Sequence, residues 1–301
     1  MRKLLLGLTF AMIASVAQAD YTMVVPQKPG GGTSVWAEIV AKELEKYLGE
    51  DINIKHIPGA RDIPGFNAWH NEMRDDDKVI MVSHGGNGVA FLQENVDYDY
   101  RQYESVGLMN LNIIAGKRVG ADMSNPSFAA GSGQTPEAYA FTMLICGPTA
   151  GMQAYIDCFK ENVTWVKGMS GSERRLAFKR GELNGTRENP AAYKKHGEFY
   201  DAYKLVKSFR DGMQKALWVN KGNPNATVLQ AALRAMSRNP ESRAIIEKKV
   251  GQYDWKIGAE GNAHRDTLMT LVTVDALKDL VLFNTQALGL ASVFKADLAS
   301  K

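Results

Sequence analysis

The fold is decided by residues 21–54, which read YTMVVPQKPGGGTSVWAEIVAKELEKYLGEDINI. The apolar run 21–25 predicts a short buried strand that stops at a proline. From Thr33 to Gly49, good capping residues enclose apolar residues at helical spacing, which predicts a helix. Residues 52–54 alternate like a second strand. This stretch therefore predicts a strand–loop–helix–strand unit.

The same order of strand, small-residue loop and helix recurs along the chain. Alternating strands and helices indicate an α/β fold with largely parallel sheets. Loops at the carboxyl ends of such strands are where ligands collect. The expected pairs of strand and loop are 78–82 with 83–87, 127–130 with 131–136, and 163–166 with 167–172. A return strand is expected at 215–219, followed by mostly helical chain.

Composition is typical of an exported globular chain. Residues 1–19 run from a basic start through an apolar stretch to the small-x-small pattern that signal peptidases accept, and the apolar run is too short to span a bilayer. We therefore expect cleavage after Ala19 and a periplasmic protein. About 280 residues remain, enough for two lobes. The net charge of +3, with both signs interspersed, provides no basic stripe for nucleic acid.

Cysteine and histidine usage narrows the chemistry further. The two cysteines, Cys146 and Cys158, are expected to form a disulfide in an oxidising compartment, with buried free thiols as the alternative. Neither they nor the five histidines have the spacing of a metal site. We therefore expect no metal and no cofactor.

The loop at 29–34, Pro-Gly-Gly-Gly-Thr-Ser, predicts an oxyanion site. It places unhindered backbone N–H groups at the positive end of a helix, which suits a carboxylate or a phosphate. The spacings of a nucleotide P-loop and of a dinucleotide-binding loop are both missing. A plain tight turn with a helix cap is the alternative.

The stretch 24–69 resembles the N-terminal signature of the extracytoplasmic receptors of tripartite tricarboxylate transporters, the Bug family. The matching positions are Pro26, Pro29 to Thr33, Leu48-Gly49 and Pro58-Gly59-Ala60. Weaker similarity extends through 83–87, 129–133, Lys167-Gly168 before Ser170, and Asn189-Pro190.

This resemblance implies a two-lobed periplasmic-binding-protein fold, type II-like, with helices on both sheet faces and the ligand in the cleft of a Venus flytrap. The first two loops would hold a carboxylate, partly through ordered water. The expected lobes are 20–111 plus 218–301, and 112–217. The implied function is that of a monomeric receptor, not an enzyme, which delivers a small organic solute, preferably a carboxylate, to the permease subunits of the transporter.

Three departures from the family pattern bear on the ligand. Ser34 stands where the family has Asp, Arg61-Asp62 replaces a Gly pair, and Gln27-Lys28 replaces apolar residues. Arg187 stands where the family often has an acidic residue and offers a guanidinium fork for a second carboxylate or a sugar hydroxyl. A salt bridge to Glu188 is the alternative. His84 is expected to donate to the ligand, unless it is a surface residue.

The predicted ligand-binding residues combine small loop residues with hydrogen-bond donors. They are Gln27, Lys28, Gly31, Gly32, Thr33, Ser34, Ser83, His84, Gly85, Asn87, Ser132, Gln134, Thr135, Ser170, Arg187 and Asn189.

Aromatic residues divide between core and site. Trp36 falls in an apolar helical stripe and is expected in the core, whereas Trp165 precedes a loop and is expected at the cleft wall. The tyrosines at 98, 100 and 103 alternate with aspartates, which favours a solvated turn with partial packing.

Three alternatives to this function stay open. A secreted serine hydrolase would use Ser132 or Ser170, but neither lies in Gly-x-Ser-x-Gly and no Ser-x-x-Lys follows either serine. A receptor for a neutral sugar or a sugar acid would use the same polar loops. A receptor that feeds a sensor kinase has no distinguishing sequence feature.

Overall fold

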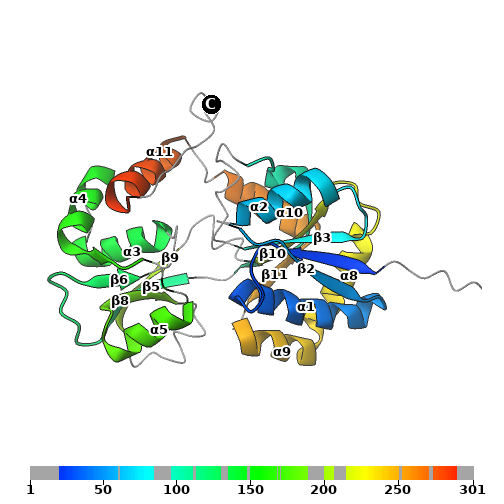
Figure 1. Ribbon diagram of the computed structural model, residues 1–301, viewed down its shortest axis with the longest axis horizontal. Coiled ribbons are helices and arrows are strands. Elements are labelled where there is room, and N and C mark those ends of the chain that lie inside the picture. Colours follow the sequence, from blue (N-terminus) through cyan, green and yellow to red (C-terminus); the bar gives the residue numbers. More distant parts are fainter. Residues whose placement is uncertain are drawn as a thin grey trace, which may run out of the picture.

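The computed structural model describes residues 20–59, 62–84, 96–110, 113–129, 135–147, 150–167, 169, 171–188, 200–206, 215–250, 253–270 and 274–289. These residues form two lobes, each built around one sheet, which lie side by side along the long axis of the molecule (Figure 1). The α/β class and the two lobes agree with the prediction from the sequence. Residues 1–19 lie outside the described part.

The first sheet has the strand order β11-β4-β10-β3-β1-β2. Strand β1 pairs in parallel with β2 and β3, which confirms the predicted β-α-β unit. Strand β10 runs antiparallel to both β3 and β4, and β11 runs antiparallel to β4. The strands are β1 (Tyr21–Val25), β2 (Ile52–His56), β3 (Val79–His84), β4 (Tyr103–Asn110), β10 (Lys215–Asn220) and β11 (Asp254–Ile257).

Helices cover both faces of the first sheet, because each face carries a separate apolar core. On one face lie α1 (Gly32–Leu48), α8 (Ala226–Arg238) and α9 (Pro240–Val250). On the other lie α2 (Ile63–Ala68), the π-helix η2 (Trp69–Met73), the 3-10 turn η5 (Tyr100–Gln102) and α10 (Ala259–Met269), above the sheet in Figure 1. Trp36 is a core residue, as predicted.

The predicted solvated turn at Tyr98, Tyr100 and Tyr103 is wrong. All three side chains are at most 1% exposed and pack against Phe66 of α2. The rings of Phe66 and Tyr98 stack with centroids 4.1 Å apart. The helix α2 supplies the apolar partners that the local aspartate-rich sequence does not reveal.

The second sheet has the strand order β7-β6-β8-β5-β9. Strand β6 pairs in parallel with β7 and β8, whereas β5 runs antiparallel to β8 and β9. Both sheets are therefore mixed and not largely parallel, because the strands that follow the chain's crossings between the lobes, β5 and β10, run against their neighbours. The strands are β5 (Ile113–Arg118), β6 (Ser127–Ala129), β7 (Thr164–Trp165), β8 (Gly185–Glu188) and β9 (Tyr200–Val206).

The helices of the second lobe are α3 (Thr135–Cys146), α4 (Met152–Asn162) and α5 (Gly171–Arg180). A disulfide between Cys146 and Cys158 joins α3 to α4, with their Cα atoms 6.5 Å apart, as predicted. The last described segment, α11 (Val274–Leu282) and the π-helix η7 (Phe283–Ala287), also contributes to this lobe. Phe283 packs on Phe159 with ring centroids 5.4 Å apart, although the sequence-based division placed this part of the chain in the first lobe.

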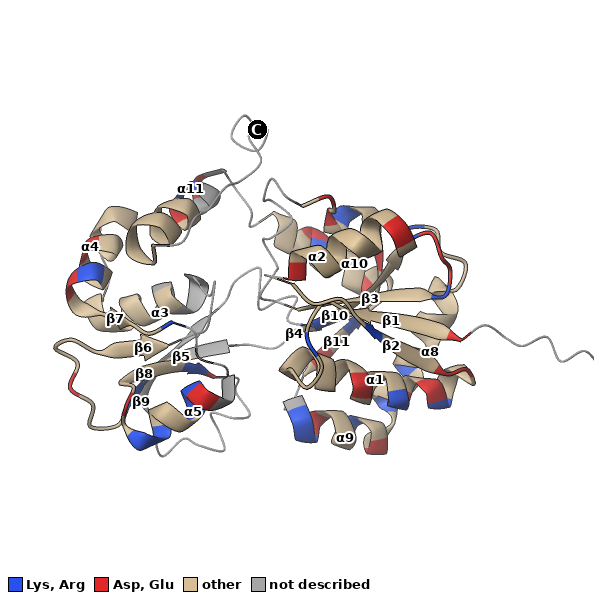
Figure 2. Cartoon of the chain, in the orientation of Figure 1, with Lys and Arg blue, Asp and Glu red and all other residues tan. Residues whose placement is uncertain are grey.

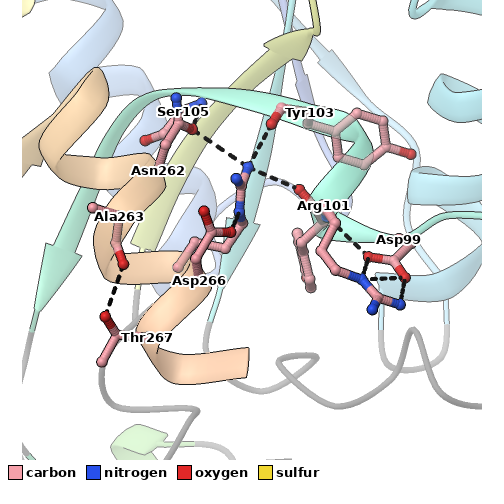
Figure 3. A network of polar contacts seen from close by, with 10 residues as sticks. Asp99, Arg101, Tyr103, Ser105, Asn262, Ala263, Asp266 and Thr267 are labelled. Atoms are coloured by element: carbon pink, nitrogen blue, oxygen red, sulfur yellow. Dashed lines mark hydrogen bonds and ion pairs between the residues drawn. The ribbon is translucent and has the colours of Figure 1, made fainter. Parts of the chain in front are cut away.

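A buried arginine of α10 forms hydrogen bonds at the start of β4. Figure 3 shows the surroundings, with Asn262 and Asp266 of α10 and with Tyr103 at the start of β4. Arg265 is 7% exposed, and its Nη1 donates to the carbonyl oxygens of Tyr100 and Tyr103 at 3.2 and 2.5 Å. Its Nε donates to Asp266 at 2.9 Å, and Asn262 accepts a further bond from Nη1. This network fixes the start of β4, the strand from whose other end the chain passes to the second lobe.

Acidic and basic residues both occur on the helices α1, α5 and α9 (Figure 2), in agreement with the interspersed charges of the sequence. Within the described ranges, no helix combines the length and the apolar character needed to cross a bilayer.

Candidate ligand-binding site

The chain passes between the two lobes twice, and we call these two connections the crossings. In both lobes the carboxyl ends of the parallel strands lie on the side of the sheet where the crossings begin or end. In the first lobe β4 ends at Asn110, and β5 of the second sheet begins at Ile113, at most about 11 Å of chain further on. The return crossing runs from the end of β9 at Val206 to the start of β10 at Lys215. Lys215 is paired with His84, the last residue of β3. The strand-end edge of the first sheet therefore carries both crossings.

In the second sheet, too, the carboxyl ends of the parallel strands lie on the side where the crossings begin or end. Near the end of β8, Glu188 pairs with Ile114, close to the start of β5. Because β6 and β7 run parallel to β8, their carboxyl ends lie at this edge too. The predicted loops of the two lobes thus begin at the two sheet edges that the crossings join.

The first loop leads from β1 into α1 and forms a helix N-terminus without an acidic residue in its first turn. Gly31 is the N-cap, and the first helical bond runs from Val35 N–H to its carbonyl at 2.9 Å. The N–H groups before Val35 belong to the part of the helix that has no intrahelical acceptor. Ser34 Oγ accepts from Gly30 N–H at 3.3 Å and donates to Glu38 at 2.7 Å. The Ser34 hydroxyl therefore stabilises this loop by joining Gly30 to Glu38 of α1.

Gln27, His84 and Asp62 form a polar chain across the ends of β1 and β3. His84 Nδ1 lies next to Asp62 Oδ2, a contact that is an ion pair when the imidazole is protonated, and His84 Nε2 lies 3.2 Å from Gln27 Nε2. If Nδ1 donates to the carboxylate, Nε2 accepts from the amide, which corresponds to one neutral tautomer. Burial and the charge of Asp62 raise the pKa of the Tyr98 hydroxyl, which lies under this pair. His84 thus has partners inside the protein, and its role as a ligand donor stays a prediction.

Asp62 is the one described residue other than glycine with a positive φ, 64°. The left-handed region costs most residues about 1 kcal/mol or more, but Asp tolerates it better. Its side chain is 5% exposed. Holding this backbone conformation aims the carboxylate at His84, a role that the sequence analysis did not assign.

Lys215 is the second site residue that sequence reasoning missed. Its Nζ donates to Thr33 Oγ1 at 2.7 Å, and both residues are buried, at 8% and 2% exposed. Beside it, Ser83 Oγ accepts from Trp218 Nε1 at 2.7 Å, so this predicted ligand residue has a partner in the core. A lysine at the first position of a predicted return strand was the available signal, because an antiparallel strand begins where its neighbours end.

The exposed and half-buried parts of the first loop remain accessible. Lys28 and Gly32 are exposed, and Gln27 and Gly31 are half-buried, whereas Thr33 and Ser34 turn inward. The structure therefore brings six predicted residues of the first loop together with Ser83 and His84 at one sheet edge.

Two of the predicted ligand-binding residues, Arg187 and Thr135, belong to the described part of the second lobe. Arg187 lies on β8 opposite Ala115 and is half-buried. Its neighbour Glu188 accepts from Arg175 Nε and Nη2, an ion pair that joins β8 to α5. Thr135 is the first residue of α3. The remaining predicted residues, which are Gly85, Asn87, Ser132, Gln134, Ser170 and Asn189, lie outside the described residues.

The chemistry of this arrangement is that of an anion receptor. Backbone N–H groups, a buried ammonium and amide and hydroxyl groups gather at one edge, and a carboxylate accepts from all of them. Across the ranges that the structure describes, no group of three or more His, Cys, Asp or Glu residues is arranged to hold a metal ion.

Comparison with known proteins is informative only at the level of structure. No protein-family model and no curated protein sequence matches the chain. The structure resembles BugD, described as a periplasmic binding protein, with a TM-score of 0.57 at 18% identity, covering 89% of this chain and 97% of that one. A TctC solute-binding protein from Polaromonas gives 0.55 at 16%, covering 88% and 98%.

MatC from Rhodopseudomonas palustris, solved with bound malate, gives a TM-score of 0.51 at 17% identity and covers 89% of this chain and 98% of that one. Similarity at this level of identity reports the arrangement of the elements and not the ligand. The chain therefore has the two-lobed fold of the periplasmic solute-binding proteins represented by TctC and BugD.

Proposed function

We propose that this protein is a periplasmic receptor of the Bug type, which captures a small carboxylate-bearing solute for a tripartite tricarboxylate-type transporter. One observation carries the proposal. The anion-attracting loop between β1 and α1, the end of β3 and the start of β10 all lie at the sheet edge from which the chain crosses to the other lobe. A ligand at this edge touches both lobes, and binding then favours the closed arrangement of the lobes.

The ligand class follows from the donors. A helix N-terminus and the ammonium of Lys215 favour an anion, and a carboxylate matches the bond distances of N–H and O–H donors. Because MatC was solved with bound malate, dicarboxylates are the first ligands to test. In this proposal Arg187, next to the last residue of β8 in the second sheet, binds the second carboxylate.

The mechanism is capture, closure and delivery. In this proposal the first lobe holds residues 20–110 with 215–270, and the second holds 113–206 with 274–289. Rotation about the two crossings closes the lobes over the ligand, and the closed form is recognised by the permease subunits. Cleavage after Ala19 and a monomeric receptor complete the proposal, and the protein performs no reaction on its ligand.

A thermal-shift screen of the mature protein tests this function. The panel contains di- and tricarboxylates, aromatic acids, sugar acids and neutral sugars, because a ligand that binds only the folded state raises the unfolding midpoint. We expect a dicarboxylate to give the largest shift, confirmed by titration calorimetry. Arg187→Ala should weaken binding of that acid.

The alternatives predict different results. A hit among neutral sugars alone would keep the receptor and remove the carboxylate. No hit in the panel, together with turnover of an ester substrate that is lost in Ser132→Ala or Ser170→Ala, would replace the receptor with a hydrolase.

A further inference from the structure

Strand β2 forms one edge of the first sheet. Among the described residues it has a neighbouring strand on one side only, the parallel strand β1. Just beyond β2, the N–H of Ile57 donates to the carbonyl of Val25 at 3.0 Å. Because successive residues of a strand turn their backbone groups to opposite sides, those of Ile54 and His56 point away from β1. This edge of the sheet is therefore open.

The side chains of β2 leave the open edge accessible. Ile54 is half-buried and packs against the core between the sheet and α1, whereas Asn53 and Lys55 are exposed. The N–H of Ile52, which also points outward, donates to Glu45 Oε1 of α1 at 3.0 Å. Beyond Ile52, the edge offers backbone donors and acceptors to another extended chain.

A hollow of about 300 Å³ lies between this edge and α1. Its wall carries the carboxylates of Glu38, Glu45 and Asp51 and a single ammonium, that of Lys42. Glu45 is only 14% exposed and pairs with Lys42 at 2.8 Å. Glu38 accepts from Ser34, yet its side chain is 47% exposed, and Asp51 is exposed. The accessible charge beside the open edge is therefore negative.

The edge strands β11 and β7 differ from β2. On β11, Lys256 forms ion pairs with Asp254 and Glu260, both at 2.9 Å, so charged side chains cover that strand. Strand β7 of the second sheet has two residues, which are too few to hold a partner strand. In contrast, β2 combines an open backbone edge with an adjoining acidic hollow.

We propose that the open edge of β2 binds an extended, basic segment of the permease, which adds a further strand to the first sheet. Backbone hydrogen bonds to Ile54 and His56 hold the segment, as in other complexes formed by strand addition. A Lys or Arg side chain of the segment enters the hollow beside Asp51. A second copy of β2 would bring the same carboxylates to this edge, and like charges oppose such pairing.

The identity of the partner rests on the proposed function, whereas the binding edge does not. The first test therefore uses peptides and no solute. The probe is a short capped peptide of alternating Val and Lys, and the matched peptides carry Glu or Gln in place of Lys. Amide hydrogen exchange of the whole mature protein reports binding at Ile54 and His56, and titration calorimetry gives the affinity.

We expect the Val-Lys peptide to bind and to slow amide exchange at Ile54 and His56, and the Val-Glu peptide not to bind. Asp51→Lys reverses an exposed charge beside the edge and should weaken binding by about fivefold at low salt, a loss that shrinks as salt is added. Asp275→Lys is the matched control and should bind like the unmodified protein, because Asp275 is 94% exposed on α11.

Strand addition itself is tested through the backbone. Ile54→Pro removes an outward N–H, which an edge strand tolerates, and should abolish the protection. A Val-Lys peptide methylated at alternate backbone nitrogens makes the same test on the unmodified protein, so the result does not depend on the folding of that variant. Equal binding of the Lys and Glu peptides, or binding without slower exchange at Ile54, would overturn the inference.

The partner is tested with membrane vesicles that contain the permease. Asn53→Cys, labelled with a photoreactive maleimide, places a cross-linker on β2, and Cys146 and Cys158 are joined in the disulfide and do not react. We expect a cross-link to a permease subunit that an excess of the Val-Lys peptide prevents. No cross-link to the permease would overturn the inference. Failure of the unmodified protein to bind any solute in the thermal-shift panel would overturn the proposed function alone.

Discussion

Replacing Arg265 with methionine removes the guanidinium that fastens α10 to the beginning of β4 (Figure 3). Two backbone carbonyls, those of Tyr100 and Tyr103, lose a charged donor in a region that is almost entirely buried. We expect the first lobe to lose about 2–4 kcal/mol of its free energy of unfolding.

The magnitude follows from the contacts. A hydrogen bond to a charged group contributes about 1.5–3 kcal/mol, so two such bonds set an upper value of about 6 kcal/mol. Methionine offsets part of this loss, because it fills most of the same space and does not have to be desolvated as a cation. The bond from Nε to Asp266 contributes little, since that carboxylate is 61% exposed.

Tryptophan fluorescence during urea unfolding measures the free energy of unfolding of the first lobe, to which Arg265 belongs. Four of the five tryptophans belong to the first lobe, two in the core on each face of its sheet. The control is Asp266→Asn, which removes only the exposed ion pair and should cost at most about 1 kcal/mol. A loss below about 1 kcal/mol in Arg265→Met, or an equal loss in both variants, would refute the reasoning.

Two further predictions concern pH and redox state. Burial raises the pKa of the Glu43 carboxyl, but hydrogen bonds from Lys46 and Ser242 outweigh burial and hold that pKa below its usual value. The resulting stability is present at neutral pH and is lost as pH falls below about 4.3 and through the folded pKa, so urea midpoints should fall less steeply with acid in Glu43→Gln. Equal acid slopes in both proteins would contradict this. Reduction of the Cys146–Cys158 bridge should cost about 2–4 kcal/mol in the second lobe, seen as faster hydrogen exchange in α3 and α4. A double serine variant should show the same exchange with or without reductant, and unchanged exchange on reduction of the native protein would argue against a stabilising bridge.

Local sequence signals predicted the first β-α-β unit closely. The expected strand at 21–25 is β1, and the expected helix is α1. The predicted N-caps Thr33 and Ser34 are wrong, because both lie inside α1 and Gly31 is the N-cap, whereas Gly49 ends the helix as predicted. Gly49 has a φ of 71°, the left-handed conformation that a helix-terminating glycine adopts readily. These features depend on neighbours within a few residues, so a single stretch of sequence is sufficient to predict them.

Strand direction and burial were predicted less well. The antiparallel strands β5 and β10 follow the crossings between lobes, and no local periodicity reports the direction in which a strand enters a sheet. The tyrosines at 98, 100 and 103 are surrounded by aspartates in sequence, yet pack against Phe66. Burial here depends on a helix about 30 residues away in the chain.

The sequence by itself determined the class of fold and the order of strand, glycine loop and helix around 29–34, because glycine spacing and apolar periodicity are local properties. Only the tertiary structure decided which groups meet that loop. Lys215 reaches Thr33 across 182 positions of sequence, and Asp62 reaches His84 between two separate elements. Such pairs form where the start of α1 meets β10 and the start of α2 meets β3, and these meetings are set by the order of the strands and the packing of the helices in the whole lobe.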